Sequence, residues 1–429
     1  MNRQLLPILA LVVMIPLTQA KAAGLSGATQ TALVPGANVQ ELLQWADTHN
    51  PELAAMRYEI DAARERILPA ASLPDPTLRA TFMDFAGPGA PDGFNPLPGK
   101  GSGTQYRLGQ TFPWWGKRDL RKELATAELE QVKGRRGATV AEIHARIKSA
   151  YAQYYQAVAL KKLNEEILHL LTGLESTAQV RYASGLVPQQ DVIRAQVEKT
   201  TLRAEIINLD TEHHHAMTKL NVALGRPQLA PIAEPQALRR IAPEKLDGAT
   251  LQEKAARANP LLATQSAQVS AADANRRLVE RNRYPDVTLM IAPTQRDGNI
   301  DSWEAMVEIN LPIRFDTRRS QESEAAAMLA AAKERQQAIE NLVVGNLQES
   351  LAALEAAGRQ EQLITDTLLP QAELTFRSAL AGYENGEVDF ATMLDAQRAI
   401  WRAKQDRIRA QVEQEVRLAE IERIIGEAL

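Results

Sequence analysis

The chain has 429 residues, contains no cysteine, and carries 49 basic against 53 acidic residues, which gives a formal net charge of −4. The lack of cysteine excludes disulfides and thiolate chemistry, and the lack of a basic excess argues against nucleic acid as a partner. The length alone would allow two or three ordinary domains.

The first 22 residues have the features of an export signal. Arg3 gives a positive start, Leu5 to Leu17 form an apolar run, and Ala20-Lys21-Ala22 offers a small-x-small cleavage site. The run is shorter than the about 20 apolar residues that a membrane-spanning helix needs, and no later stretch comes near that length. We therefore expect a mature chain that begins near Ala23, and any membrane residence must depend on β-strands.

Two phrases about two hundred residues apart repeat each other. They begin Tyr182-Ala183-Ser184-Gly185-Leu186-Val187 and Tyr383-Glu384-Asn385-Gly386-Glu387-Val388, and both read Y-x-x-G-x-V-x-x-x-x-[VM]-[IL]-x-A-Q. A shared spacing of this length indicates one structural unit written twice. We therefore predict a first repeat at 23–229 and a second at 249–429, joined by a proline-rich linker at 230–248.

Each repeat is predicted to contain the same elements in the same order. A helix opened by a related Asn-Pro phrase (Asn50-Pro51, Asn259-Pro260) comes first, then two short strands, then a very long helical region that is broken once by the repeated phrase. The predicted strands lie at about 76–85 and 104–113 in the first repeat and at about 285–293 and 302–313 in the second. The predicted helical tips lie at 183–187 and 384–388, where Gly185 and Gly386 permit the left-handed backbone of a tight turn.

The strand predictions depend on period-two alternation. In the fourth strand, Trp303, Ala305, Val307, Ile309 and Leu311 fall on one face, whereas Glu304, Met306, Glu308 and Asn310 fall on the other. This pattern is expected for a membrane barrel wall with lipid outside and water inside. A soluble, half-buried sheet would show the same pattern.

The helix lengths favour the membrane alternative. Lys117 to Tyr182 contains no proline, and its 66 residues would reach roughly 100 Å. Apolar residues recur along it with the 3.5-residue period of a coiled-coil seam: Val140, Ile143, Ile147, Ala150, Tyr154 and Ala157. Stacked end to end, the segments Val39–Ala70 and Pro188–Leu224 match this length. We therefore predict that each repeat contains one continuous helix beside a composite of two shorter helices.

Four strands cannot close a barrel, because bacterial outer-membrane barrels begin at about eight strands. Three copies that share one barrel would supply twelve strands and would arrange the helices as a hollow cylinder. The predicted fold class is therefore mostly α with a small β part. It is a long coiled-coil α-helical barrel in which each chain contributes four strands to a shared 12-stranded transmembrane β-barrel of a homotrimer.

These residues resemble the TolC-like outer-membrane efflux proteins, the homotrimeric exit ducts of tripartite export systems. The resemblance covers nearly the whole mature chain, from the Asn-Pro helix starts through the strand ends Phe112-Pro113 and Leu311-Pro312 to both tip phrases. The phrase from Gln110 to Arg118 looks like the strand-to-helix junction of the branch associated with heavy-metal exporters.

The resemblance implies a periplasmic gate at the helical tips. In the family, inner helices carry acidic rings and a gating tyrosine there, and by motif alignment these roles fall on Asp191, Tyr383 and Asp395. This chain departs from the family pattern at Val388, where the best-known member has a gate arginine, and at Thr392, which aligns with another acidic ring.

Other candidate sites carry competing interpretations. Glu304 and Glu308 would face the barrel lumen and bias cation passage, or would only keep a wet wall solvated. Trp114 and Trp115 would mark a membrane interface, or would pack in a core.

Two further motifs are not interpreted as functional sites. His213-His214-His215 points in three directions on a helix, which disfavours a metal site. Gly99-Lys100-Gly101-Ser102-Gly103, in a predicted extracellular loop at 85–103, lacks the following helix that a phosphate loop requires.

We find no catalytic motif and no cofactor site, so we expect a non-enzymatic protein. The expected function is an outer-membrane exit duct in a Gram-negative bacterium, with a large periplasmic helical portion. It would conduct metal cations or small toxic compounds from an RND-type inner-membrane pump and a periplasmic adaptor (membrane fusion protein). The alternative is a periplasmic coiled-coil adaptor or scaffold without a channel.

Overall fold

The computed structural model describes residues 36–83, 103–239, 241–296 and 299–429. The predicted export signal at 1–22 lies outside the described residues, as does nearly all of the predicted loop at 85–103. Within the described ranges, no helix is both long enough and apolar enough to cross a membrane.

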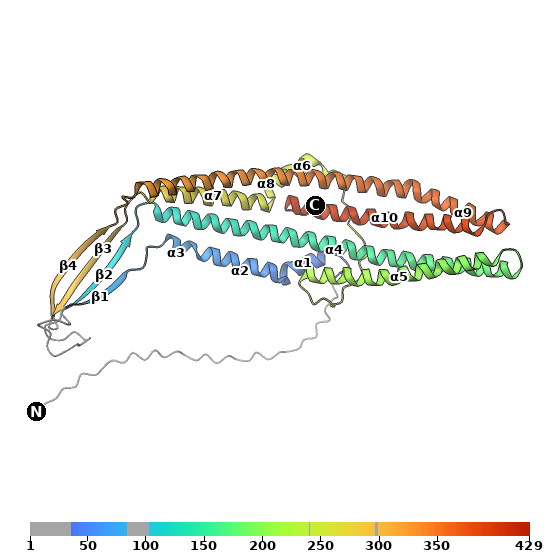
Figure 1. The fold of residues 1–429 in the computed structure, drawn as a ribbon, viewed down its shortest axis with the longest axis horizontal. Helices are drawn as coiled ribbons and strands as arrows, with labels where there is room; N and C mark the ends of the chain where they lie inside the picture. The colour runs from blue at the N-terminus through green and yellow to red at the C-terminus, as the bar shows by residue number, and fades with distance from the viewer. Residues whose placement is uncertain (1–35, 84–102, 240, 297–298) are drawn as a thin grey trace, which may run out of the picture. The chain divides into compact units, whose positions relative to one another are not determined.

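Long helices make up most of the described chain (Figure 1). The first repeat contains α1 (Val39–His49), α2 (Pro51–Glu65), α3 (Ile67–Ala71), α4 (Lys117–Ala183) and α5 (Gln189–Leu224). The second contains the 3-10 turn η1 (Pro243–Leu246), α6 (Gly248–Ala258), α7 (Pro260–Arg281), α8 (Phe315–Leu363), the π-helical turn η2 (Ile364–Leu368), α9 (Leu369–Asn385) and α10 (Phe390–Ile425). The predicted helix starts at the Asn-Pro phrases are confirmed, since α2 begins at Pro51 and α7 begins at Pro260. The segment Val39–Ala70, which was expected to be one helix, is broken at Asn50 and again at Arg66.

The long helix of the second repeat is interrupted, whereas that of the first is not. η2 lies between α8 and α9, directly before Pro370. A proline lacks the N–H group and its ring clashes with the carbonyl four residues earlier, here that of Asp366 within η2. The wider π turn accommodates this clash, while α4 contains no proline and stays regular over 67 residues.

The four strands form one antiparallel sheet in the order β1-β2-β3-β4. They are β1 (Thr77–Met83), β2 (Gly103–Phe112), β3 (Val287–Arg296) and β4 (Asn299–Ile309). Pairing of β2 with β3 joins the two repeats, with Phe112 opposite Val287, which in turn lies opposite Ile309. β4 ends at Ile309, four residues before the predicted end, because Pro312 cannot donate a ladder hydrogen bond.

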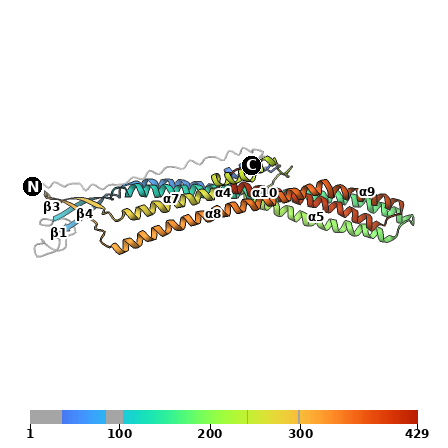
Figure 2. The same ribbon diagram turned by 90° about the horizontal axis from the view of Figure 1, so that it is seen from above.

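The two repeats interlock through α4. This helix packs against α5 of its own repeat and against α7 and α10 of the other (Figures 1 and 2). Its predicted seam is confirmed, since Ile143, Ile147, Ala150, Tyr154 and Ala157 are buried and Val140 is partly buried. The core is therefore a narrow apolar stripe between helices, as coiled-coil spacing requires.

An asparagine joins two helices end to end in each repeat. The Asn50 Oδ1 atom accepts the N–H groups of Glu52 and Leu53, while its Nδ2 donates to the carbonyl of Ala223 at the end of α5, at 3.1 Å. Asn259 does the same for Leu261 and Leu262 and for the carbonyl of Ile424 in α10. Each side chain thus caps one helix start and one helix end.

A glycine completes each joint. Gly225 and Gly426 end α5 and α10 with φ values of 70° and 76°, which favour glycine. A Cβ atom on Gly225 would lie 2.6 Å from Pro51 Cδ, and one on Gly426 would lie 2.5 Å from the Ala258 carbonyl oxygen. The two short helices can therefore abut only because both positions lack a side chain.

The linker between the repeats is fixed by buried charges. Arg239 donates to Glu415 and Glu422 of α10, at 2.9 Å in each case, and Lys148 of α4 donates to Glu422 at 2.7 Å. Burial raises the pKa of Glu415. Burial would also raise the pKa of Glu422, but hydrogen bonds and charges from Arg239 and Lys148 bring it below its ordinary value. Removing one partner would leave a buried, uncompensated charge.

Candidate functional site

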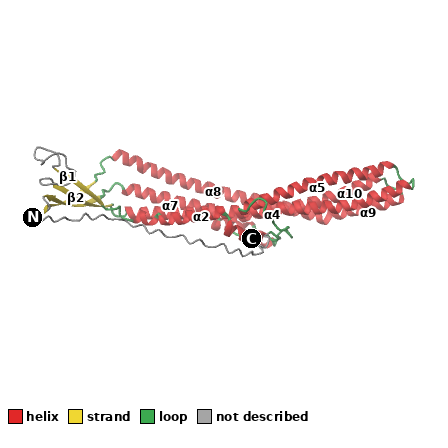
Figure 3. Cartoon of the chain, turned by 90° about the horizontal axis from the view of Figure 1, so that it is seen from below, coloured by secondary structure: helices red, strands yellow, loops and turns green. Residues whose placement is uncertain are grey.

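Both helical tips reverse at a left-handed glycine, at the end of the helices opposite the sheet (Figure 3). Gly185 and Gly386 have φ values of 72° and 82°, and nothing lies within 4 Å of a Cβ atom built on either one. The turns are closed by the Leu186 N–H donating to the Arg181 carbonyl and the Glu387 N–H donating to the Gly382 carbonyl. Glycine is thus required here for backbone conformation and not for space.

Tyr383 is buried between the two hairpins. Only 3% of it is exposed, whereas Tyr182, at the matching motif position, is 46% exposed. The Arg181 guanidinium carbon lies 4.9 Å from the Tyr383 ring centroid, and the Phe390 ring meets it edge-on at 5.5 Å. The hydroxyl has no hydrogen-bond partner among the described residues, and burial, followed by the charge of Asp191, raises the pKa of Tyr383.

Asp191 lies beside this tyrosine and is also buried, with 8% exposed. Burial raises the pKa of the Asp191 carboxyl, and the charge of Asp389 raises it further, while Arg194 and Arg181 act in the opposite direction. The structure therefore brings together two of the three predicted gate residues, Asp191 and Tyr383. Both are turned into the contact between hairpins.

Arg181 completes this group and was missed in the sequence. Besides facing the Tyr383 ring, it donates to the Glu384 carbonyl at 2.8 Å, so α4 is tied to the turn of the other hairpin. A hint was available in the sequence, because the position before the repeated tyrosine is Arg181 in one repeat and Gly382 in the other. Gly382 leaves room for Val388, whose Cγ2 lies 2.6 Å from where a Cβ would be.

Asp395, the third predicted gate residue, belongs to a separate group. Its side chain is 71% exposed and accepts from Arg398 at 3.2 Å. Arg398 also donates to Glu198 of α5 at 3.0 Å, and Glu198 is 9% exposed. One arginine thus bridges an exposed acid and a buried acid across the two hairpins, so Asp395 is not a free carboxylate. Asp389 caps α10, because its side chain accepts the backbone N–H of Thr392 at 2.9 Å.

The polar face of the sheet carries both signs of charge. Glu304 accepts from Gln105 at 3.0 Å, and Glu308 lies opposite Thr288. Arg79 and Arg107 face each other on the same side of β1 and β2. The two basic side chains offset the two predicted lumen carboxylates within one chain.

The other face is apolar and exposed. Its most exposed members are Leu78, Phe82, Leu289, Ile291, Trp303, Val307 and Ile309, each between 48% and 73% exposed. A sheet that leaves this much apolar side-chain surface uncovered needs a partner or a lipid on that side.

The two tryptophans at the strand-to-helix junction have different surroundings. Trp114 stacks on Tyr284 with ring centroids 5.2 Å apart, and its backbone N–H donates to Asp286. Trp115 is 80% exposed. Trp114 therefore stacks on a neighbouring aromatic ring and is partly buried, whereas Trp115 is exposed.

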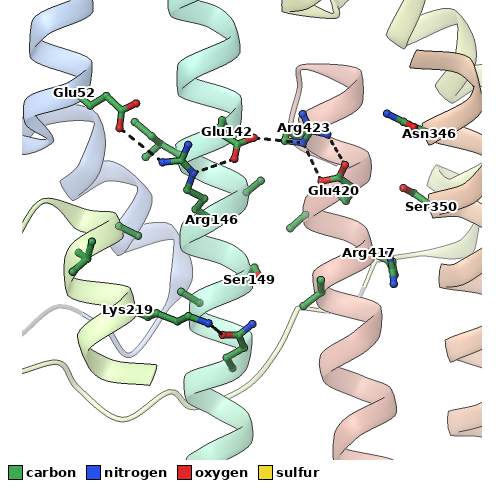
Figure 4. A pocket seen from close by; sticks show the side chains of 18 of the residues that line it. Glu52, Glu142, Arg146, Ser149, Lys219, Asn346, Ser350, Arg417, Glu420 and Arg423 are labelled. Atoms are coloured by element: carbon green, nitrogen blue, oxygen red, sulfur yellow. Dashed lines mark hydrogen bonds and ion pairs between the residues drawn. The ribbon is translucent and has the colours of Figure 1, made fainter. Parts of the chain in front are cut away.

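A groove of about 740 Å³ lies beside α4 and α10 (Figure 4). Five of its charged side chains pair with one another: Arg146 pairs with Glu52 and Glu142, and Arg423 pairs with Glu142 and Glu420. His213 lies on the apolar seam with its ring 5.1 Å from that of Tyr154. Over the described residues, no group of three or more His, Cys, Asp or Glu side chains is placed to hold a metal ion.

Two stacked-helix repeats that share a sheet at one end and turn at glycines at the other define the class of fold, a duplicated helical hairpin with a four-stranded sheet. The chain belongs to the outer membrane efflux protein family, whose sequence profile matches residues 42–226 and 251–427. This confirms the resemblance found in the sequence.

Particular relatives agree with this assignment. The chain is 24% identical over 379 residues to the cobalt-zinc-cadmium resistance protein CzcC of Cupriavidus metallidurans, covering 85% of this chain and 84% of that one. The outer membrane protein VceC of Vibrio cholerae has a TM-score of 0.77 at 19% identity, with 91% and 96% of the two chains covered. CusC has a TM-score of 0.77 at 15% identity, with 91% and 92% covered. The structural likenesses establish the fold.

Proposed function

We propose that this protein is the outer-membrane exit duct of a tripartite efflux system. It passively conducts substrate from an inner-membrane pump of RND type and a periplasmic adaptor to the outside of a Gram-negative cell. Family membership over most of the chain carries this proposal. The cargo class, metal cations or small toxic compounds, is supported by the name of the relative CzcC.

The duct is a homotrimer with a shared 12-stranded barrel. Two observations support this assembly. β1 and β4 each pair with one neighbour in the sheet, and an open edge in lipid would leave backbone groups unsatisfied. One face of the sheet is also apolar and uncovered. Three copies joined from β4 to β1 would satisfy the edges and place the apolar face toward lipid.

The duct closes at the tips, where Asp191, Tyr383 and Asp395 form the gate. Three copies of Asp395 in a narrow ring would repel one another and attract cations. Changing Asp395 to Ala should alter single-channel conductance or cation block in a planar bilayer. Asp406→Ala is a matched control, since Asp406 also pairs with an arginine three residues later in α10, at 3.3 Å. Equal responses from both variants would remove Asp395 from the gate.

The competing function is a periplasmic scaffold whose strands form a soluble sheet. Washing outer membranes with high salt and urea should leave the duct in the membrane and release a scaffold. A heat-sensitive trimer on a gel would support the duct, whereas a soluble monomer would exclude it. Deletion of the chain followed by a sensitivity screen against metals, dyes and antibiotics should identify the cargo.

A further inference from the structure

The segments that leave the sheet carry several of the most exposed apolar side chains in the described chain. Trp115 is 80% exposed, Phe315 is 77% exposed, and Leu311 and Ile313 are each 72% exposed. They come from both repeats: Trp115 lies between β2 and α4, Leu311 and Ile313 lie between β4 and α8, and Phe315 is the first residue of α8. No cluster of buried residues includes any of them.

The sheet register places these side chains at one level. Phe112, Val287 and Ile309 lie in one row across β2, β3 and β4. Trp115 follows this row by three residues, and Ile313 follows it by four. The two segments therefore leave the same end of the sheet, and we name their four exposed apolar side chains together the junction collar (Trp115, Leu311, Ile313, Phe315).

Basic side chains adjoin the collar. The stretch 117–122 has four basic residues and one acid, a local charge of +3, and 314–319 has three basic residues and one acid, a local charge of +2, although the whole chain has a net charge of −4. Some of these side chains are occupied: Lys117 pairs with Asp286, and Arg118 and Arg318 bond to backbone carbonyls. Arg314 and Arg319 are exposed and form no ion pair within the described ranges.

We propose that the junction collar binds the headgroups of anionic phospholipids, with Trp115, Ile313 and Phe315 among the acyl chains and Arg314 and Arg319 on the phosphates. Guanidinium groups match phosphate oxygens in geometry and charge. Aromatic side chains favour the level of the headgroups, and an apolar surface flanked by basic residues favours an anionic leaflet. This inference rests on the proposed function, because it places the apolar sheet face in the bilayer.

Brominated acyl chains quench tryptophan on contact and can test this. The full mature protein would be reconstituted in mixtures of phosphatidylglycerol and phosphatidylcholine of fixed composition, with the bromine on one lipid or the other. One version would keep only Trp115 and another only Trp303, with the remaining tryptophans changed to Phe. Heat-sensitive trimers on a gel would verify assembly of every variant.

We expect bromine on phosphatidylglycerol to quench Trp115 more strongly than the fraction of phosphatidylglycerol in the bilayer predicts. The double variant Arg314→Gln/Arg319→Gln should lower the relative binding constant for phosphatidylglycerol by about fivefold for each charge, roughly 25-fold in all. Salt should reduce the same preference. Arg335→Gln, which removes an exposed charge farther along α8, should leave it unchanged.

The outcomes separate this inference from the function on which it rests. If Trp303 is quenched and Trp115 shows no preference for phosphatidylglycerol, the collar proposal is wrong and the duct stands. If Trp303 is quenched and neither lipid reaches Trp115, a second copy covers the collar, which also overturns the proposal. If neither lipid quenches Trp303, the sheet is not in the bilayer and the duct itself is wrong.

Discussion

The two repeats are alike at their helix joints and different at their tips. Asn50 and Asn259 make the same set of hydrogen bonds, and both abut a left-handed glycine. At the tips the same motif position is exposed in Tyr182 and buried in Tyr383. The joints lie within a repeat, whereas Tyr383 and Arg181 lie where one hairpin meets the other. The two repeats are thus alike in the joints that each forms by itself, and they differ where they contact each other.

The surroundings of the joints show the same division. Asn221 and Glu422 stand at matching places near the ends of α5 and α10, and both are buried. Asn221 donates to the carbonyls of Gln228 and Ala230, close along the chain. Glu422 instead binds Lys148 of the other repeat and Arg239 of the linker. The first contact is local and the second connects the repeats.

Among the predicted changes, Tyr383→Ala should lower stability the most. A small effect would contradict the difference between the two tips. Removing a buried aromatic ring costs about 3 to 5 kcal/mol, while Tyr182→Ala should change stability by no more than about 0.5 kcal/mol because that ring is exposed. Hydrogen exchange of α9 and the start of α10, together with thermal unfolding, measures both. Tyr383→Phe is the control and should be nearly neutral, since no described residue bonds to the hydroxyl.

Glu422→Gln should have the next largest effect and lower the free energy of unfolding by about 2 to 3 kcal/mol, because hydrogen bonds to charged groups are stronger than those between neutral groups. Asn221→Ala should lower the free energy of unfolding by about 1 to 2 kcal/mol, since it removes two hydrogen bonds between neutral groups. Thermal unfolding followed by circular dichroism would compare the two. Equal losses would show that the charges between repeats contribute no more than the local contact.

Asn50→Ala and Asn259→Ala should each cost about 1 to 2 kcal/mol by the loss of a helix cap. The two losses of unfolding free energy should agree to within about 0.5 kcal/mol, because the two joints have matching geometry. The same unfolding experiment measures both variants. A loss confined to one of them would mean that the joints only look alike.

The smallest expected effect is a pH dependence at the first tip. Burial raises the pKa of Asp191, so the Asp191 carboxyl binds a proton more tightly when the tip is packed than when it is open. The packed tip therefore loses stability as the pH rises above the ordinary pKa of 3.8. Asp191→Asn should therefore slow hydrogen exchange of the tip at neutral pH, and the difference from the natural protein should shrink on acidification. A pH-independent difference would assign the effect to packing and not to charge.

The sequence determined the repeat, the element types and the positions of the turns, because each depends on spacing along the chain. Coiled-coil periodicity, period-two alternation and glycine before a reversal are local signals. The sequence marked helix starts at Asn50-Pro51 and Asn259-Pro260, but the residues before Asn50 were counted into the same helix because the helices on either side are individually favourable. The need for a cap appears only when the second helix abuts the first.

The tertiary structure alone decided the state of the candidate gate. The sequence pointed to Asp191, Tyr383 and Asp395, but burial of the first two and the pairing of the third come from residues far away along the chain. Arg398, which pairs with Asp395, also binds Glu198, which lies 200 residues earlier in the chain. A side chain's charge partner and exposure are set by what packs against it, and for these residues the packing surface is the other repeat.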